Sequence, residues 1–317
     1  MKLLTAFFRL IRWPNLVFII ITQCLFYFCI IVPVLPASYY LLPLKLTQPL
    51  FFLLVTASVL IAAGGYIIND YFDINIDKIN KPGKMVVEKM IKRRWAIVLH
   101  LLITTIGVAI SLYVSYRTSF VVGISNIICT LSLWFYSTTF KRKLLSGNII
   151  ISILTAWTIL VLYFAVNTTY RITTDIASEI YTALFKIYKF AAVYAGFAFI
   201  ISLVREVVKD IEDMEGDEKH DCQTMPIVWG VPVAKVFVAV WIIVLIGTLL
   251  ILQFYSIEKG QWPGALYCMI FIIIPLIYTL RKFYKATVTA DYHRISSLIK
   301  TIMFTGILSM LFLLLFQ

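Results

Sequence analysis

Nine long apolar segments dominate this chain, and they constrain its fold more than any other feature. Each has about 18 to 24 residues, the length that an α-helix needs to cross roughly 30 Å of hydrocarbon. Because unpaired backbone groups are too costly inside a bilayer, each segment is predicted to be a transmembrane helix. The segments lie near residues 15–35, 48–69, 95–116, 118–137, 147–167, 188–208, 232–254, 261–280 and 297–316.

The composition agrees with a protein whose solvent is the bilayer. Hydrophobic residues make up 61% of the chain and charged residues only 14%, far outside the usage of soluble domains. We therefore expect one all-α transmembrane domain over residues 1–317. The first 14 residues are amphipathic, and we expect them to form an interfacial helix that leads into the first span.

The positive charge of the chain reports its topology rather than a nucleic-acid partner. Although the net charge is +12, the Lys and Arg residues lie in short loops between apolar segments and form no compact basic face. Most lie on the side of the N-terminus, and the positive-inside rule makes that side cytoplasmic and places Gln317 outside. The opposite side holds only Lys45, Arg117, Arg171, Lys186, Lys189 and Lys259.

Most carboxylates lie on the same cytoplasmic side, and they form two repeated motifs. The second span ends in Asn69-Asp70-Tyr71-Phe72-Asp73-Ile74-Asn75-Ile76-Asp77, which contains the spacing DxxDxxxD. The sixth span ends with the same spacing at Asp210, Asp213 and Asp217. At about 100° per residue, the three aspartates of each motif share one stripe of a helix.

Two such stripes suit the binding of a diphosphate through magnesium. Mg²⁺ prefers carboxylate and phosphate oxygens, and it stabilises a leaving diphosphate. Solvated helix ends are the simpler explanation for a single Asp, but they do not explain two copies of one spacing. Glu212, Glu215 and Glu218 lie off the stripe, and we expect them to face water.

At these residues the chain resembles the UbiA-type intramembrane prenyltransferase family. The resemblance covers nearly the whole chain, including both motifs, the segment from Tyr136 to Lys141, Gly147-Asn148 and Thr224-Met225-Pro226. It implies an all-helical bundle around a central cavity, with cytoplasmic cap helices over the active site. It also implies Mg²⁺-dependent transfer of a prenyl group from an isoprenyl diphosphate to a lipid or aromatic acceptor. No obligate protein partner is inferred.

The resemblance also implies roles for individual residues. The metal ligands would be Asn69, Asp73, Asp77, Asp210, Asp213 and Asp217. The catalytic residues would be Asp73, Asp77, Asp213, Asp217, Lys141 and Tyr136. Residues expected to bind substrate are Asn69, Asp70, Lys81, Lys84, Arg205, Lys209, Arg12 and Asn15. The chain departs from the family pattern at Lys81 and Lys84, where Arg is more usual, and at Asp221, where Gly is common.

Within the family, the chain most resembles the branch that prenylates geranylgeranylglyceryl phosphate. The alternative within the family is an aromatic acceptor of quinone biosynthesis. A cation-coupled transporter is an alternative of another class, although transport sites lie near the middle of the bilayer and these motifs lie at span ends. A CDP-alcohol phosphotransferase would need a DG and AR pattern that does not follow Asp73. We expect the protein in the cell (inner) membrane, with its active site on the cytoplasmic side.

Overall fold

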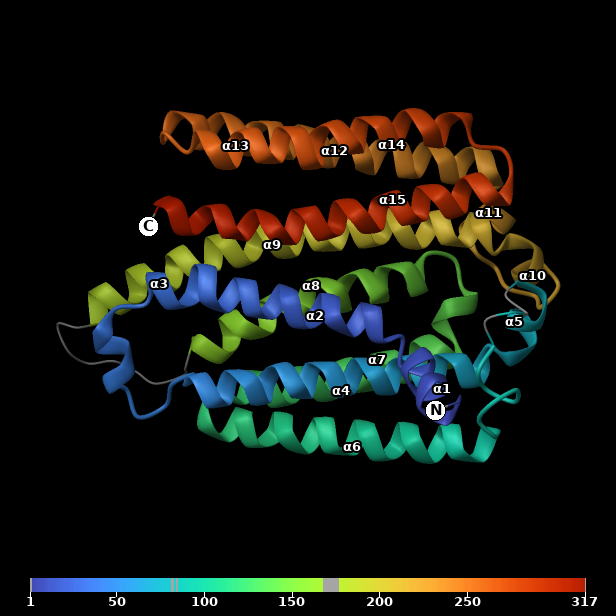
Figure 1. The fold of residues 1–317 in the computed structure, drawn as a ribbon, viewed down its shortest axis with the longest axis horizontal. Coiled ribbons are helices and arrows are strands. Elements are labelled where there is room, and N and C mark those ends of the chain that lie inside the picture. Colours follow the sequence, from blue (N-terminus) through green and yellow to red (C-terminus); the bar gives the residue numbers. More distant parts are fainter. Residues whose placement is uncertain (1, 81–82, 84, 168–176, 317) are drawn as a thin grey trace.

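The computed structural model describes residues 2–80, 83, 85–167 and 177–316, and helices account for nearly all of them. Nine helices or helix pairs in these ranges are long and apolar enough to cross a membrane, which confirms the predicted all-α membrane fold. They run side by side along the long axis of the molecule (Figure 1). They are α2 (Trp13–Phe26, continued to Val34 by α3, Val32–Val34), α4 (Gln48–Phe72), α6 (Arg93–Arg117), α7 (Phe120–Thr138), α8 (Ser146–Val166), α9 (Ala177–Glu212), α12 (Val231–Glu258), α13 (Trp262–Cys268) with α14 (Ile274–Lys285), and α15 (Thr289–Leu308).

The sixth span is longer than its apolar segment. The hydrophobic pattern predicts a helix over 188–208, whereas α9 begins at Ala177. Charged residues interrupt the first turns of α9, but Ile180 and Ile187 are fully buried in the core. The helix therefore continues beyond the apolar segment because one of its faces still packs against the bundle.

Short helices gather at one end of the bundle. They are α1 (Lys2–Leu10), α5 (Ile74–Asn80), α10 (Met214–Glu218) and α11 (Met225–Val228). The N-terminus lies near this end, and the C-terminus lies at the opposite end (Figure 1). Helices α5 and α10 follow the two aspartate motifs directly, so the ends of α4 and α9 both meet this group of short helices.

Small residues allow α4 and α6 to pack closely. A Cβ atom added at Gly107 would lie 3.2 Å from the backbone nitrogen of Ile61, and one added at Gly64 would collide with the Thr104 side chain. The same contact places Nδ1 of His100 at 2.9 Å from the carbonyl oxygen of Gly64. Packing through small residues is the usual way in which helices associate inside a membrane, and here it fixes the position of the helix that carries the first motif.

Candidate active site

One cavity of about 530 Å³ joins the two aspartate motifs. Apolar side chains such as Leu154, Ile159 and Phe197 line part of its wall. The site residues predicted from the sequence also line it: Arg12, Asn15, Asn69, Asp70, Asp73, Asp77, Tyr136, Lys141, Arg205, Lys209, Asp210, Asp213 and Asp217. Lys81 and Lys84 lie outside the described residues. The structure thus brings together every described residue that the sequence assigned to the site.

The sequence predicted that the three aspartates of the first motif lie along one continuous helix. The structure shows a bend within the motif instead. Helix α4 ends at Phe72 and α5 begins at Ile74, with Asp73 between them at φ −85° and ψ 0°. The backbone hydrogen bonds nevertheless continue through the bend: the N–H of Asp73 donates to Asn69 at 2.9 Å, and that of Asp77 donates to Asp73 at 2.8 Å. The motif is therefore a bent helix end whose backbone remains paired.

The second motif bends at the equivalent residue. Helix α9 ends at Glu212 and α10 begins at Met214, with Asp213 between them at φ −94° and ψ 5°. The N–H of Asp213 donates to Lys209 at 2.8 Å, and that of Asp217 donates to Asp213 at 3.2 Å. The shared spacing therefore corresponds to a shared backbone geometry, in which the middle aspartate occupies the bend.

Asn80 joins the two bends. Its side-chain amide donates to the carbonyl oxygen of Asp213 at 2.9 Å, and its Oδ1 accepts from the N–H of Gly216 at 2.9 Å. A Cβ at position 216 would collide with the Asn80 amide, so this close approach requires glycine. Asn80 is a residue that sequence reasoning missed, because the pairing of α5 with α10 is visible only in three dimensions.

Lys141 neutralises the middle aspartate of the first motif. Its ammonium forms an ion pair with Asp73, whose residue is 4% exposed, and the Asn69 amide donates to the same carboxylate at 2.6 Å. Burial alone would lower the pKa of Lys141, but the Asp73 carboxylate outweighs it and raises that pKa above its ordinary value. Lys141 is therefore a fixed cation at neutral pH.

Arg12 forms the second ion pair of the first motif. It adopts φ 50° and ψ 51° between α1 and α2, a left-handed conformation that costs about 1 to 2 kcal/mol for a residue with a Cβ. Its guanidinium reaches Asp70 at 2.6 Å and lies 5.2 Å from the centre of the Tyr66 ring. Burial opposes the charge, yet Asp70 raises the pKa of Arg12 above its ordinary value.

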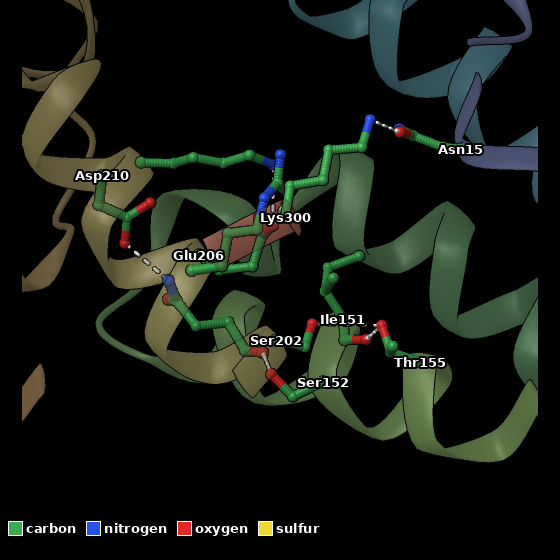
Figure 2. A network of polar contacts seen from close by, with 11 residues as sticks. Asn15, Ile151, Ser152, Thr155, Ser202, Glu206, Asp210 and Lys300 are labelled. Atoms are coloured by element: carbon green, nitrogen blue, oxygen red, sulfur yellow. Dashed lines mark hydrogen bonds and ion pairs between the residues drawn. The ribbon is translucent and has the colours of Figure 1, made fainter. Parts of the chain in front are cut away.

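At Asp210 of the second motif, an amide takes the place of these cations. The Asn148 amide donates to Asp210 at 2.8 Å, and Figure 2 shows the Asp210 carboxylate directed at this contact. One helical turn earlier, Glu206 accepts from Arg205 at 3.2 Å and from Lys209 at 2.8 Å. Sequence reasoning missed Glu206, although its position four residues before Asp210 places it on the same helical face.

Two further residues differ from their sequence-based description. Glu212 does not face water: its side chain is 13% exposed and accepts from Nδ1 of His293 at 2.7 Å. Glu215 and Glu218 are exposed, as expected. Lys300, on α15, lines the cavity and was not predicted, although a cation inside an apolar span is itself a signal of function.

The backbone explains the unusual Asp221. This residue has φ 55°, in the left-handed region where glycine is favoured and where Asp is one of the better tolerated alternatives. A family preference for Gly at this position therefore has a conformational cause.

The residues around the first motif fit a magnesium ion that is shared with a substrate. Oδ1 of Asn69 is buried and has no hydrogen-bond partner among the described residues, so it is an oxygen that a cation can satisfy. Within the same described ranges, no group of three His, Cys, Asp or Glu residues could enclose an ion alone. Mg²⁺ commonly takes only one or two carboxylates and completes its shell with phosphate oxygens and water.

Comparisons with known proteins identify the family of the chain. The model of the UbiA prenyltransferase family matches residues 25–313. A digeranylgeranylglyceryl phosphate synthase of Methanosphaera stadtmanae is 30% identical over 69% of this chain and 71% of its own length. A solved structure of a digeranylgeranylglyceryl phosphate synthase superposes with a TM-score of 0.63 and 23% identity, covering 99% of both chains.

A second solved structure comes from a UbiA homologue of Archaeoglobus fulgidus with bound DMAPP and Mg²⁺. Its TM-score is 0.57 at 14% identity, and the match covers 98% of this chain and 100% of the other. At this identity the two structures show a shared fold.

Proposed function

Because the chain belongs to the UbiA prenyltransferase family, we propose that it transfers a geranylgeranyl group from geranylgeranyl diphosphate to geranylgeranylglyceryl phosphate. The proposal rests on one observation: a single cavity is lined by carboxylates from both motifs and also by apolar side chains. A prenyl diphosphate has this same division between a charged head and an apolar chain. The acceptor follows from the relatives, which are named digeranylgeranylglyceryl phosphate synthases.

In the proposed reaction, the bond between C1 of the prenyl group and the diphosphate oxygen breaks, and the electron pair leaves with the diphosphate. The free hydroxyl oxygen of the acceptor forms a bond to C1, and its proton passes to the departing diphosphate. Lys141 faces the diphosphate as a permanent cation. The rings of Tyr66 and Tyr136 line the cavity and can stabilise positive charge on the allylic group.

We also propose that Mg²⁺ holds the donor. Asn69, Asp73 and Asp77 would bind it from the first motif, and Asp210, Asp213 and Asp217 from the second. When bound, the ion neutralises charge that develops on the leaving diphosphate. The bend at Asp73 and the bend at Asp213 present these groups to one cavity, and Asn80 holds the two bends together.

The orientation in the membrane is a further part of the proposal. The short helices and both motifs lie at the end of the bundle where basic loops are most abundant, which favours a cytoplasmic active site. An accessibility test with cysteines introduced at Glu215 and at Lys259 would check it. Labelling of position 215 by an impermeant reagent in intact cells would contradict it.

The function is tested with purified protein in detergent and geranylgeranyl diphosphate as the donor. Geranylgeranylglyceryl phosphate, 4-hydroxybenzoate and dihydroxynaphthoate are compared as acceptors, with and without EDTA. We expect Mg²⁺-dependent product with the glyceryl phosphate only. Product with an aromatic acid alone would contradict the proposed acceptor, and no diphosphate release with any acceptor would contradict prenyl transfer.

A further inference from the structure

A group of three cations beside the second motif forms ion pairs with one carboxylate in the described part of the chain, Glu206. It consists of Arg205 and Lys209 on α9 and Lys300 on α15, and all three line the cavity. Building on the proposed function, we propose that Lys300, Arg205 and Asn15 bind the phosphate group of the acceptor, so that the cavity selects an acceptor that carries a phosphate monoester.

Lys300 is held in place without a carboxylate partner in the described part of the chain. Its ammonium donates to Oδ1 of Asn15 at 2.9 Å and lies 5.1 Å from the centre of the Phe18 ring (Figure 2 shows Lys300 directed at Asn15). An ammonium group has three donors, and this hydrogen bond uses one of them. Since an unbalanced charge within a helical bundle is costly, the position suits a residue that meets an anionic ligand.

Arg205 has an unused donor in the same place. Its Nη1 donates to Glu206 at 3.2 Å, whereas its buried Nε has no hydrogen-bond partner among the described residues. Lys209 donates to the same Glu206 oxygen at 2.8 Å. A buried N–H without a partner can be satisfied by a hydrogen-bond acceptor such as a phosphate oxygen. In the same way, a cation can satisfy the buried Asn69 oxygen.

The charges of the group match those of a phosphate monoester. Arg205, Lys209 and Lys300 are three cations, and Glu206 is the one carboxylate among the described residues with which any of them forms an ion pair, so two positive charges have no carboxylate in contact with them. Arg12 adds none because Asp70 balances it. A phosphate monoester carries about −1.5 to −2 at neutral pH, whereas an aromatic carboxylic acid carries a single negative charge. The group therefore favours the glyceryl phosphate over the aromatic acceptor.

The position of the group also suits the geometry of the reaction. Glu206 precedes Asp210 by four residues on α9, which is slightly more than one helical turn, or about 6 Å along the helix axis. A phosphate bound beside Arg205 would lie about one turn from the donor diphosphate at the motif. In a glyceryl phosphate, the free hydroxyl is separated from the phosphate by the glycerol carbons alone, so an anchored phosphate would hold that hydroxyl near C1 of the donor.

The test compares Lys300→Met with the wild type on two acceptors, geranylgeranylglyceryl phosphate and the same molecule without its phosphate. We expect the KM for the phosphorylated acceptor to rise about 10- to 100-fold, the usual range for one lost hydrogen bond to a charged group. The KM for geranylgeranyl diphosphate and the turnover of the unphosphorylated acceptor should stay at wild-type values. Lys300→Arg should restore most of the affinity.

Lys235→Met is the matched control. Lys235 donates to the Ala286 carbonyl at 2.5 Å and does not line the cavity, so its loss should leave both KM values unchanged. Acceptor binding is also measured without donor or magnesium, from the shift that the phosphorylated acceptor causes in the thermal unfolding midpoint. Lys300→Met should lose this shift.

Two results would overturn the phosphate site. One is an unchanged KM for the phosphorylated acceptor in Lys300→Met. The other is an equal rise in the KM for geranylgeranyl diphosphate, which would assign the cations to the donor. Failure of the proposed function would give a different result, because the wild type would then form no product. The shift in the thermal unfolding midpoint would still show whether Lys300 binds the phosphate.

Discussion

The two aspartate motifs have the same backbone and different electrostatic surroundings. Asp73 and Asp213 occupy equivalent bends, and each lies between a long helix and a short one. At the first motif, Lys141 and Arg12 form ion pairs with Asp73 and Asp70. At the second, Asp210 receives a neutral amide from Asn148, and no ion pair to Asp210 joins the described residues.

The spacing of each motif and the partners of its carboxylates therefore come from different parts of the chain. The backbone of each motif depends on its own sequence, whereas Arg12, Lys141 and Asn148, which contact its carboxylates, come from segments packed beside it. The first motif is largely neutralised before any substrate arrives. Asp210 of the second motif has only the neutral Asn148 amide as its hydrogen-bond partner among the described residues, so this carboxylate depends more on a cation that arrives with the substrate.

Amide substitutions at Asp73 and Asp210 should reduce activity most, and they should differ in their effect on stability. Asp73→Asn and Asp210→Asn should each lower turnover by at least about 100-fold, since under the proposed function each removes a charge that would hold the magnesium and the leaving diphosphate. Only Asp73→Asn should also destabilise the protein without metal, by about 1 to 3 kcal/mol, because it leaves the Lys141 charge without its partner. Thermal unfolding in detergent with EDTA measures this. Equal destabilisation by both variants would contradict the asymmetry.

Lys141 tests the same asymmetry from the other side of the ion pair. Lys141→Met should lower turnover about 100-fold. A group with a raised pKa stabilises the fold below its unfolded pKa and loses that contribution as the pH rises through its folded pKa. Because Asp73 raises the pKa of Lys141 above 10.5, the stability difference between this variant and the wild type should stay constant from about pH 7 to 9.5. If the stability difference between the variant and the wild type were already lost as the pH rises from about 7 to 9, Lys141 would not be a fixed cation.

The connection between the motifs should have a moderate effect. In Gly216→Ala, the new methyl group would meet the Asn80 amide and separate the two bends, at a cost of about 1 to 3 kcal/mol. Turnover should fall, and the magnesium concentration for half-maximal activity should rise. Gly196→Ala is the control on α9, since a Cβ there meets no atom within 4 Å. If both variants behave alike, the Asn80 contact is not what holds the motifs together.

The smallest effect concerns the turn that follows the second motif. Asp221→Gly relieves a left-handed φ but adds backbone freedom to the unfolded chain, so the stability should change by less than about 1 kcal/mol. Asp221→Val should destabilise the protein more, because a β-branched side chain is poorly tolerated at positive φ. Melting temperatures of the two variants would show the difference, and a stable Asp221→Val would refute the conformational reason for Gly.

The apolar segments predicted most of the fold, and the repeated DxxDxxxD spacing predicted the aspartates of the candidate site. Segment length alone indicates the nine helices, and two copies of DxxDxxxD identify six aspartates that line the cavity. The bends at Asp73 and Asp213 were not predictable, because an aspartate in the middle of a helical pattern carries no signal for a helix end.

The contacts that residues make across the bundle could not be predicted from the sequence. Asn80, Asn148 and Lys300 act on groups that lie far from them in the chain. Their partners depend on which helices become neighbours, and one sequence does not specify that. Glu212 was misjudged for the same reason, since His293 approaches it from another helix.

The hydrogen bond between Asn80 and Gly216 also orders events during synthesis. The two residues are 136 positions apart, and four of the apolar spans lie between them. When the ribosome has completed the first motif, the residue that fixes its short helix has not yet been made. The newborn chain must therefore insert its sixth span before α5 can dock, and translation has to pass residue 216 before the protein can acquire a working catalytic centre.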